Sequence, residues 1–262
     1  MQLKAIQNLI SNWLSEYNEK ARTKGFVIGI SGGIDSALTS TLAAETGAKL
    51  TCVSMPIHQE ATQLERANRH IEFLKSKYGN VTSVEVDLSA MYDGFLATIP
   101  STEKGEQLDL SLANARARLR MTTLYYFAGI EQKLVLGTGN KVEDFGVGFF
   151  TKYGDGGVDV SPIADLVKSE VFELAEFVGV NQEILNAPPT DGLWGDDRTD
   201  EDQLGATYAE LEWAMNVLKN ENLAGFTKRQ QEVLEIYTKL NTANQHKMNP
   251  IPVCKIPEEF KG

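Results

Sequence analysis

The chain has 262 residues, of which 42% are hydrophobic and 23% are charged, and its formal net charge is −11. This composition is that of an ordinary soluble globular protein, and the length suits one large α/β domain, with two smaller domains as the alternative. No apolar run approaches the ~20 residues that a membrane span needs. The acidic charge argues against a nucleic-acid partner, because no local basic patch is evident that could overcome the long-range repulsion.

The first expected element is an amphipathic helix within residues 1–24. Apolar residues recur there at helical spacing, at Leu3, Ile6, Ile10 and Leu14. Charged residues lie between them, which is not the pattern of a secretory signal peptide. The two cysteines, Cys52 and Cys254, match no metal-binding or redox spacing. A reducing cytoplasm is therefore the expected location.

Short β-branched runs then alternate with helical patterns, an order typical of βαβ units. We therefore predict an α/β fold with an open, mostly parallel, doubly wound (Rossmann-like) sheet flanked by helices. The expected strands are residues 26–30, 50–55, 81–88 and 133–136. The expected helices between them are residues 35–47, 60–77 and 111–130.

The pattern loosens beyond Gly139 into a stretch rich in glycine and aromatic residues. A helix near 168–179 follows, and then the loop DGLWGDDRTDED, which carries six acidic residues and one arginine. This loop is either a mobile lid over a site or a solvated connection. Two further helices, at about 206–219 and 227–243, complete the chain. We expect one domain spanning 1–262, divided into an N-terminal helix 1–24, a nucleotide-binding core 25–190, an acidic lid loop 191–205 and C-terminal helices 206–262.

The stretch GISGGIDS, residues 29–36, joins the first expected strand to the next helix. A glycine turn at this position aims backbone N–H groups and the helix dipole at an anion. Neither the GxGxxG fingerprint nor the lysine-containing Walker loop is present. Asp35 distinguishes this loop, because a carboxylate beside phosphates becomes useful as a Mg²⁺ ligand. The alternative is that Asp35 only caps its helix.

A second strand-end loop, LGTGNKVE, occupies residues 136–143. In an open parallel sheet, ligands bind beyond the carboxyl ends of the strands, at the point where strand order reverses. If the first and fourth strands are neighbours, this loop faces GISGGIDS across that crevice, and Glu143 can share a metal with Asp35. The alternative for Glu143 is a solvated glutamate at the start of a helix.

SGGIDS resembles the pyrophosphate loop (PP-loop) of the ATP-pyrophosphatase, or adenine nucleotide alpha-hydrolase-like, superfamily, whose members activate a carboxylate or carbonyl by adenylation. Together with NARARLRM, LVLGT, GFFTKYGDGG and the late His246-Lys247 pair, it resembles the ammonia-dependent NAD⁺ synthetases from about residue 24 to 246. SGGxDS alone identifies only the superfamily, whereas FFTKYGDGG in combination with it is much more specific.

This resemblance implies ATP-dependent amidation of deamido-NAD⁺ to NAD⁺, the last step of NAD biosynthesis. The reaction would pass through an adenylated nicotinate and release AMP and pyrophosphate. The implied partners are ATP, deamido-NAD⁺ and ammonia, with Mg²⁺ as the cofactor and a homodimer as the assembly. No glutaminase domain precedes the matching region, so free ammonia is the expected nitrogen donor unless a separate glutaminase supplies it.

The resemblance also implies a role for individual residues. For ATP it implies Gly29, Ile30, Ser31, Gly32, Gly33, Ile34, Asp35, Ser36, Thr138, Lys168 and Thr190. For deamido-NAD⁺ it implies Arg118, Lys152, Asp159, His246 and Lys247. For Mg²⁺ it implies Asp35 and Glu143. The catalytic residues would be Asp35, Lys152 and Lys168.

Several of these residues have a plainer explanation. Lys168 begins a helix, where a lysine opposes the dipole, so an anion partner would account for it; otherwise it is an exposed surface lysine. Asp159 would either accept bonds from ribose hydroxyls or orient a neighbour. Arg116 and Arg120 point away from Arg118, because i+2 lies roughly 200° around a helix, and they would serve equally well as salt-bridged surface residues.

The sequence departs from the family pattern in two places. The interval from Glu143 to Phe149 is one residue longer, which loosens the placement of Glu143, and the N-terminus is shorter. The nearest rival is another adenylating module, such as the ATPase part of a GMP synthetase, which shares SGGxDS but does not account for FFTKYGDGG. A non-catalytic adenine-nucleotide sensor is the alternative from another class, but it has no need for both Asp35 and Glu143.

Overall fold

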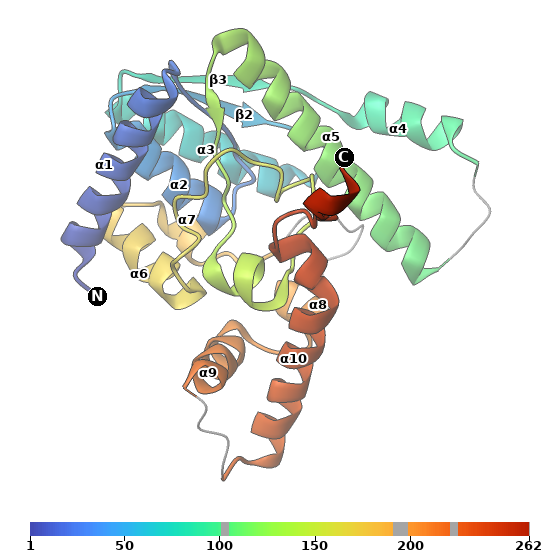
Figure 1. Ribbon diagram of the computed structural model, residues 1–262. Coiled ribbons are helices and arrows are strands. Elements are labelled where there is room, and N and C mark those ends of the chain that lie inside the picture. The colour runs from blue at the N-terminus through green and yellow to red at the C-terminus, as the bar shows by residue number, and fades with distance from the viewer. Residues whose placement is uncertain (101–104, 191–198, 221–224, 262) are drawn as a thin grey trace.

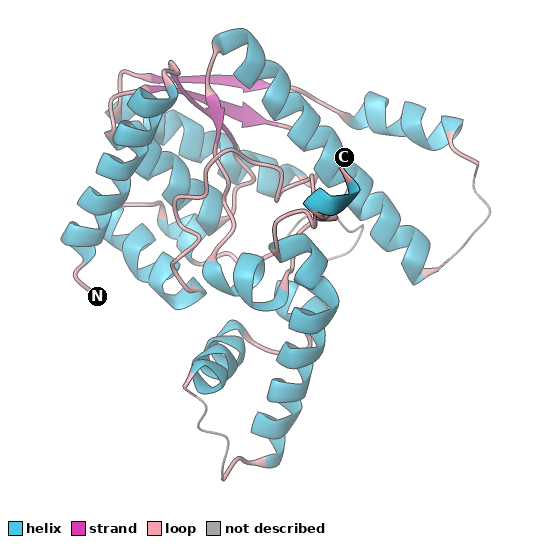
Figure 2. Cartoon of the chain, in the orientation of Figure 1, coloured by secondary structure: helices cyan, strands magenta, loops and turns pink. Residues whose placement is uncertain are grey.

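A computed structural model of the chain describes residues 1–100, 105–190, 199–220 and 225–261 (Figure 1). Within these residues the strands form one parallel sheet with helices on both faces (Figure 2). The strand order is β3-β2-β1-β4. The strands are β1 (Gly25–Gly29), β2 (Lys49–Ser54), β3 (Val81–Glu85) and β4 (Leu134–Val135). The predicted α/β fold class is confirmed.

The central strand β1 is buried on both sides, as expected for a parallel strand covered by helices on each face. It pairs in parallel with β2 and with β4. Phe26 and Ile28 enter one hydrophobic core, and Val27 between them enters the other. This alternation follows from the two-residue period of a strand. It divides the helices into two layers, one over each face.

The larger layer packs against Phe26 and Ile28. Its helices are α1 (Leu3–Ala21), α2 (Ile34–Glu45), α3 (Ala61–Lys77), α6 (Lys168–Val178) and α7 (Gln182–Leu185). The opposite face is covered by α4 (Ser89–Thr98) and α5 (Glu106–Glu131). None of the described helices is both long enough and apolar enough to cross a membrane.

A third hydrophobic cluster lies below the sheet and belongs to the C-terminal helices (Figure 1). These are α8 (Asp200–Leu204), α9 (Tyr208–Lys219) and α10 (Lys228–Met248), and a short 3₁₀ turn, η2 (Glu258–Phe260), follows them. They pack on a π-helix, η1 (Lys141–Val147). The side-chain amides of Asn241 and Asn244 donate to the carbonyls of Gly146 and Val147 at 2.7 and 2.8 Å, respectively. The C-terminal helices are thereby attached to the strand-end loop that carries Glu143.

The sequence predicted the strands and the long helices to within a few residues. It missed α4, α7, α8 and η1, because an element of three turns or fewer does not repeat an apolar period often enough to be recognised. The proposed lid loop 191–205 does not run unbroken, since residues 200–204 form α8. Residues 191–198 of that loop lie outside the described part of the chain.

Candidate active site

The GISGGIDS loop turns from the end of β1 into the N-terminus of α2. Gly32 adopts a φ of +82°, and a Cβ there would lie 2.7 Å from the Gln63 carbonyl oxygen, so only glycine suits this turn. The Ser36 hydroxyl donates to the Gly33 carbonyl at 3.0 Å and accepts from the Ser31 N–H at 3.3 Å. The two serines therefore hold the loop's own shape, in addition to any donor role toward an anion.

A pocket with a volume of about 270 Å³ opens beyond the carboxyl ends of β1 and β4. This is the crevice where strand order reverses, as the sequence predicted. The pocket is lined by all eight residues of the 29–36 loop. It is also lined by Thr138, Glu143, Lys168 and Thr190. Every residue that the sequence assigned to ATP or Mg²⁺ therefore lines one pocket, although the individual roles remain predictions.

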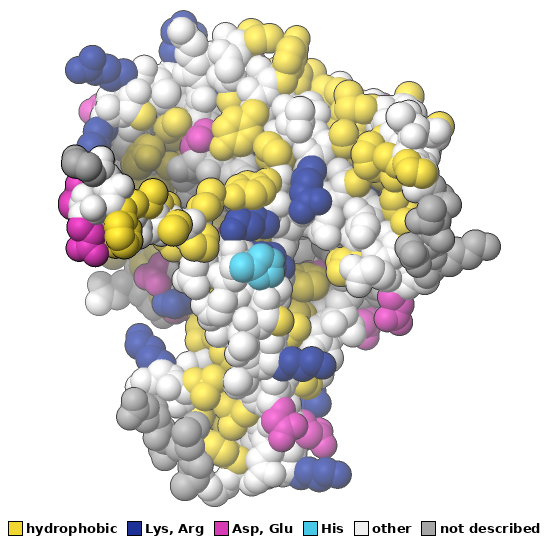
Figure 3. Space-filling view, turned by 45° about the vertical axis from the view of Figure 1, so that its right-hand side comes forward, with side chains coloured by type: hydrophobic (Ala, Val, Ile, Leu, Met, Phe, Trp, Pro, Cys, Tyr) yellow, Lys and Arg dark blue, Asp and Glu magenta, His cyan; other side chains and the backbone are white. Residues whose placement is uncertain are grey.

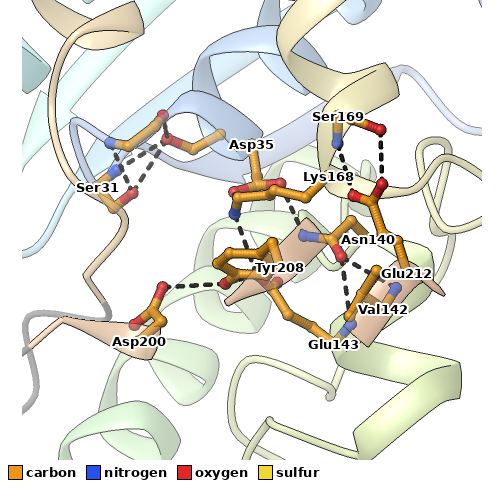
Figure 4. A network of polar contacts seen from close by, with 12 residues as sticks. Ser31, Asp35, Asn140, Val142, Glu143, Lys168, Ser169, Asp200, Tyr208 and Glu212 are labelled. Atoms are coloured by element: carbon orange, nitrogen blue, oxygen red, sulfur yellow. Dashed lines mark hydrogen bonds and ion pairs between the residues drawn. The ribbon is translucent and has the colours of Figure 1, made fainter. Parts of the chain in front are cut away.

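Asp35, Glu143 and Lys168 meet at the centre of this pocket (Figure 4). Lys168 Nζ lies 2.6 Å from Asp35 Oδ2 and 3.0 Å from Glu143 Oε1. Asn140 Nδ2 donates to the other Asp35 oxygen at 3.1 Å. Lys168 is only 3% exposed, so the surface-lysine alternative is wrong. The capping alternative for Asp35 is also wrong, because α2 has Gly33 as its N-cap and no side chain caps it.

Tyr208, which the sequence did not identify, completes the centre from the first turn of α9. Its hydroxyl donates to Glu143 Oε1 and also lies 3.2 Å from Asp200 Oδ2. Its ring lies 4.7 Å from Lys168 Nζ, in position for a cation–π contact. No local motif marks Tyr208 as part of a site, because its place depends on how α9 packs against η1 and α6.

The same helix also holds the start of α6. Glu212 of α9 accepts from the Ser169 N–H at 2.8 Å and from the Ser169 hydroxyl at 2.7 Å. Near the acidic loop, the Asp200 N–H donates to the Pro189 carbonyl at 3.1 Å, which ties together the chain on either side of residues 191–198. The C-terminal helices therefore position side chains of the pocket as well as covering a core.

Glu143 lies in the π-helix η1, and the interval from Glu143 to Phe149 begins within that turn. Its i→i+5 bonding takes up more residues per turn than an α-helix does, and such turns occur frequently at functional sites. Asn140 begins the turn, since its side-chain oxygen accepts from the N–H groups of Val142 and Glu143 at 3.1 and 3.2 Å. From this turn Glu143 faces Lys168.

Burial and neighbouring charges shift the pKa values at this centre. Burial raises the pKa of Asp35, and the Lys168 ammonium opposes that rise. Burial lowers the pKa of Lys168, but the attraction of Asp35 and Glu143 outweighs it, so the net pKa lies above the ordinary lysine value. Burial, followed by repulsion from Glu143, raises the pKa of the adjacent Asp144 to about 8. The centre thus keeps Lys168 charged between two acids.

All five residues predicted for deamido-NAD⁺ lie outside this pocket wall, and the side chains of four of them bond to main-chain carbonyls. Arg118 Nε and Nη2 both lie 3.4 Å from the Lys152 carbonyl oxygen. Lys152 Nζ in turn donates to the His246 carbonyl. Lys247 Nζ donates to the Phe150 carbonyl at 2.7 Å. The structure therefore brings Arg118, Lys152 and the main chain of His246 together beside the pocket, and their assignment to deamido-NAD⁺ stays a prediction.

The fifth, Asp159, stands apart from this group. Its carboxylate accepts from the Val135 N–H at 2.8 Å and from the Tyr125 hydroxyl at 3.0 Å. Of the two alternatives for Asp159, these contacts fit the one in which it orients neighbours. Asp159 holds the edge of β4 and fixes Tyr125 on α5.

The two flanking arginines also differ from the surface expectation. Arg120 lines the pocket, where Nε donates to the Met55 carbonyl at 3.1 Å and Nη2 to Gln59 Oε1 at 2.8 Å. Arg116 places its guanidinium 4.6 Å from the ring centroid of Tyr92. The surface role is therefore wrong for Arg120, because its side chain is half-buried in the pocket wall.

Comparison with known proteins agrees with this geometry. The sequence profile of the NAD synthase family matches residues 6–251. The NH(3)-dependent NAD(+) synthetase of Carboxydothermus hydrogenoformans is 37% identical over 222 residues, covering 84% of this chain and 88% of that protein. The enzyme of the same name from Methanosarcina mazei is 34% identical over 264 residues, covering 98% of this chain and 100% of its own.

Solved structures agree as well. The NMN synthetase from Francisella tularensis has a TM-score of 0.85 and 32% identity, with 98% of this chain and 99% of that chain covered. The NAD⁺ synthetase from Burkholderia pseudomallei has a TM-score of 0.71 and 27% identity, with 94% and 90% covered. These matches do not favour a GMP synthetase module or a nucleotide sensor. The chain belongs to the NAD synthase family.

Proposed function

We propose that this chain is a ligase that forms a carbon–nitrogen bond, amidating deamido-NAD⁺ with ammonia at the expense of ATP. The products are NAD⁺, AMP and pyrophosphate. The observation that carries the proposal is the convergence of Asp35 and Glu143 on one cation position, beside a glycine loop at a helix N-terminus, in a chain of this family. Relatives that match nearly the whole chain are named for this reaction.

The chemistry requires activation of the nicotinate carboxylate, because ammonia cannot expel oxide from it. A carboxylate oxygen attacks the α-phosphorus of ATP, and the bond to pyrophosphate breaks. Ammonia then attacks the carbonyl carbon of the acyl adenylate, loses a proton, and the bond to AMP breaks. The loop N–H groups and the α2 dipole would hold the phosphates, and Lys168 would balance the charge of the departing pyrophosphate.

Asp35 and Glu143 suit Mg²⁺ as the metal. Both offer carboxylate oxygens, the donors that Mg²⁺ prefers, and both lie within 3.0 Å of a single cation, Lys168 Nζ. In the described part of the chain, no group of three or more His, Cys, Asp or Glu side chains gathers that could hold a metal alone. Mg²⁺ commonly takes one or two carboxylates together with phosphates and water. When bound, it would neutralise charge on the phosphates.

Arg118, Lys152, His246 and Lys247 would bind deamido-NAD⁺ next to this pocket. A second candidate substrate is the mononucleotide, because a solved structure at 32% identity over 98% of this chain is named an NMN synthetase. The two candidates share the reacting nicotinate carboxylate and the ATP chemistry. They differ only in the AMP half of the dinucleotide, which Arg118, Lys152, His246 and Lys247 would contact.

We further infer a homodimer, in line with the family resemblance. The outer faces of α4 and α5 expose apolar side chains, and hydrophobic residues gather on the upper part of the face in Figure 3. Exposed members are Met91, Phe95, Tyr126 and Ile130. Exposed apolar side chains gathered on one face are typical of a protein interface. Light scattering of the purified chain would test this, and a monomer at micromolar concentration would contradict it.

The deciding experiment incubates the chain with ATP, Mg²⁺, ammonium and deamido-NAD⁺, followed by chromatography. We expect AMP and NAD⁺ to appear in equal amounts. AMP that does not rise in step with NAD⁺ would refute the proposal. Nicotinate mononucleotide in place of deamido-NAD⁺ tests the second candidate, and xanthosine monophosphate, which a GMP synthetase module would require, is the negative control.

A further inference from the structure

The nucleotide pocket has an unusual charge balance for a polyanion. Five acids line it, namely Asp35, Glu143, Asp144, Asp155 and Asp200, and the GISGGIDS loop itself holds no lysine. The cationic side chains among the described lining residues are Lys168, Arg120 and Arg66. Lys168 is engaged by two carboxylates, and Arg120 donates to Met55 and Gln59. The contacts of Lys168 and Arg120 account for those two cations but not for Arg66.

Arg66 lies in the second turn of α3, directly against the glycine loop. A Cβ on Gly32 would lie 3.4 Å from the Arg66 Cβ, 3.2 Å from the Ala67 nitrogen and 2.7 Å from the Gln63 carbonyl oxygen. This part of α3 therefore packs on the backbone of the loop. The Arg66 side chain starts beside Gly32 and forms part of the pocket wall.

The Arg66 guanidinium has a buried donor with no acceptor. Its Nε is shielded from solvent and has no hydrogen-bond partner among the described residues. Arg69, in the next turn of the same helix, shows the usual arrangement: it is exposed and pairs with Glu183 at 2.7 Å. A buried N–H of a charged group is costly to leave unpaired. Its position beside an anion-binding loop implies that a ligand provides the acceptor.

We propose that Arg66 binds the pyrophosphate portion of ATP, which deepens the proposed function and rests on it for the identity of the nucleotide. The planar guanidinium can bond two phosphate oxygens at once, as arginine does in phosphate recognition. Arg66 thereby supplies, from α3, the positive charge that a Walker loop places within the loop itself. Neither the loop motif nor the family resemblance assigns this residue.

The test compares Arg66→Gln with Arg69→Gln, a matched control on the same helix. Calorimetry measures binding of magnesium pyrophosphate, of α,β-methylene-ATP and of AMP to the full chain. We expect Arg66→Gln to weaken pyrophosphate and the ATP analogue roughly 10- to 100-fold, with AMP within about twofold. Arg66→Lys should recover part of the loss, because it keeps the charge without the fork. Arg69→Gln should change none of the three.

Unchanged pyrophosphate binding in folded Arg66→Gln would overturn the proposal, and so would a loss confined to AMP. Circular dichroism melting checks the fold, and Arg66→Lys serves as the deciding variant should the glutamine variant unfold. These measurements need no deamido-NAD⁺. A wild-type chain that binds pyrophosphate through Arg66 but makes no NAD⁺ would refute the proposed function alone.

Discussion

Lys168 Nζ lies 2.6 Å from Asp35 Oδ2, across 133 residues of sequence. The lysine begins α6, where its charge opposes the helix dipole, and it is nearly fully buried. The free-energy costs of the opposed dipole and of burying the charge are offset because Asp35 and Glu143 face Lys168 from α2 and η1. The ammonium lies between the two carboxylates that we assign to Mg²⁺, so Lys168 and the metal would compete for the same oxygens unless the lysine turns toward phosphate.

Lys168→Met tests this competition. Removing the charge leaves two buried acids without a cation, which we expect to cost about 3 kcal/mol or more in the free energy of unfolding. Urea denaturation measures the loss. Millimolar Mg²⁺ should stabilise this variant more than the wild type, because the metal can replace the lysine. Lys141→Met, which removes an exposed partner of Asp165, is the control. If Mg²⁺ stabilised the variant and the wild type equally, Lys168 and Mg²⁺ would not share one position.

Asp35→Asn should abolish most turnover while the chain stays folded. The amide keeps the size of the side chain but loses the charge that we assign to the metal, so we expect kcat to fall at least ~100-fold. Steady-state NAD⁺ formation measures this, and thermal melting confirms the fold. A variant with nearly full kcat at saturating Mg²⁺ would remove Asp35 from the metal site.

Tyr208→Phe isolates the hydroxyl that contacts Glu143. The ring stays over Lys168, but Glu143 loses a donor, and we expect a stability loss of about 1–2 kcal/mol. The Mg²⁺ concentration for half-maximal rate should rise several-fold, while the KM for deamido-NAD⁺ stays constant. Direct Mn²⁺ binding, followed by electron paramagnetic resonance, should weaken in parallel. Tyr237→Phe, in the core of the C-terminal helices, is the matched control. If both variants shift Mn²⁺ affinity alike, Tyr208 has no specific role.

His70 should make the protein sensitive to mild acid. It is fully buried between α2 and α3, its Nε2 lies 2.9 Å from Ser40 Oγ, and burial lowers its pKa to about 4. The unfolded chain binds a proton near pH 6.5 and the folded chain does not, so the stability from this group is complete above pH 6.5. It is lost as pH falls from about 6.5 to 4, by about 3 kcal/mol at most.

Urea titrations at several pH values measure the slope of the free energy of unfolding against pH. His70→Leu should flatten it between pH 4 and 6.5, whatever its effect on stability at neutral pH. An unchanged slope in that variant would assign the acid sensitivity to other groups.

The sequence by itself identified the parallel sheet, because buried β-branched runs alternate with helical periods. It also identified the phosphate loop, because the glycines, serines and Asp35 are contiguous. Thr138, Glu143, Lys168 and Thr190 were grouped with this loop through the resemblance, and the pocket contains all of them. Local order along the chain was sufficient for the sheet and the loop, since each depends on a period or on a motif of a few residues.

Other residues could be placed only by the tertiary structure. Tyr208 reaches Glu143 because α9 packs on η1, and Arg66 lies beside Gly32 because α3 packs on the glycine loop. The sequence shows both as ordinary helix residues. Asp159 likewise turned out to hold Val135 and Tyr125.

The difference between what the sequence predicted and what only the tertiary structure placed has a physical reason. Hydrophobic periodicity and turn chemistry act between neighbours in the chain, so a sequence reports them directly. The state of Lys168 depends instead on which carboxylates are packed against it in a medium of low dielectric, and that depends on the packing of four elements. The sequence determined the sheet and the phosphate loop of this protein, whereas only the tertiary structure decided that its buried lysine lies between the two acids of the predicted metal site.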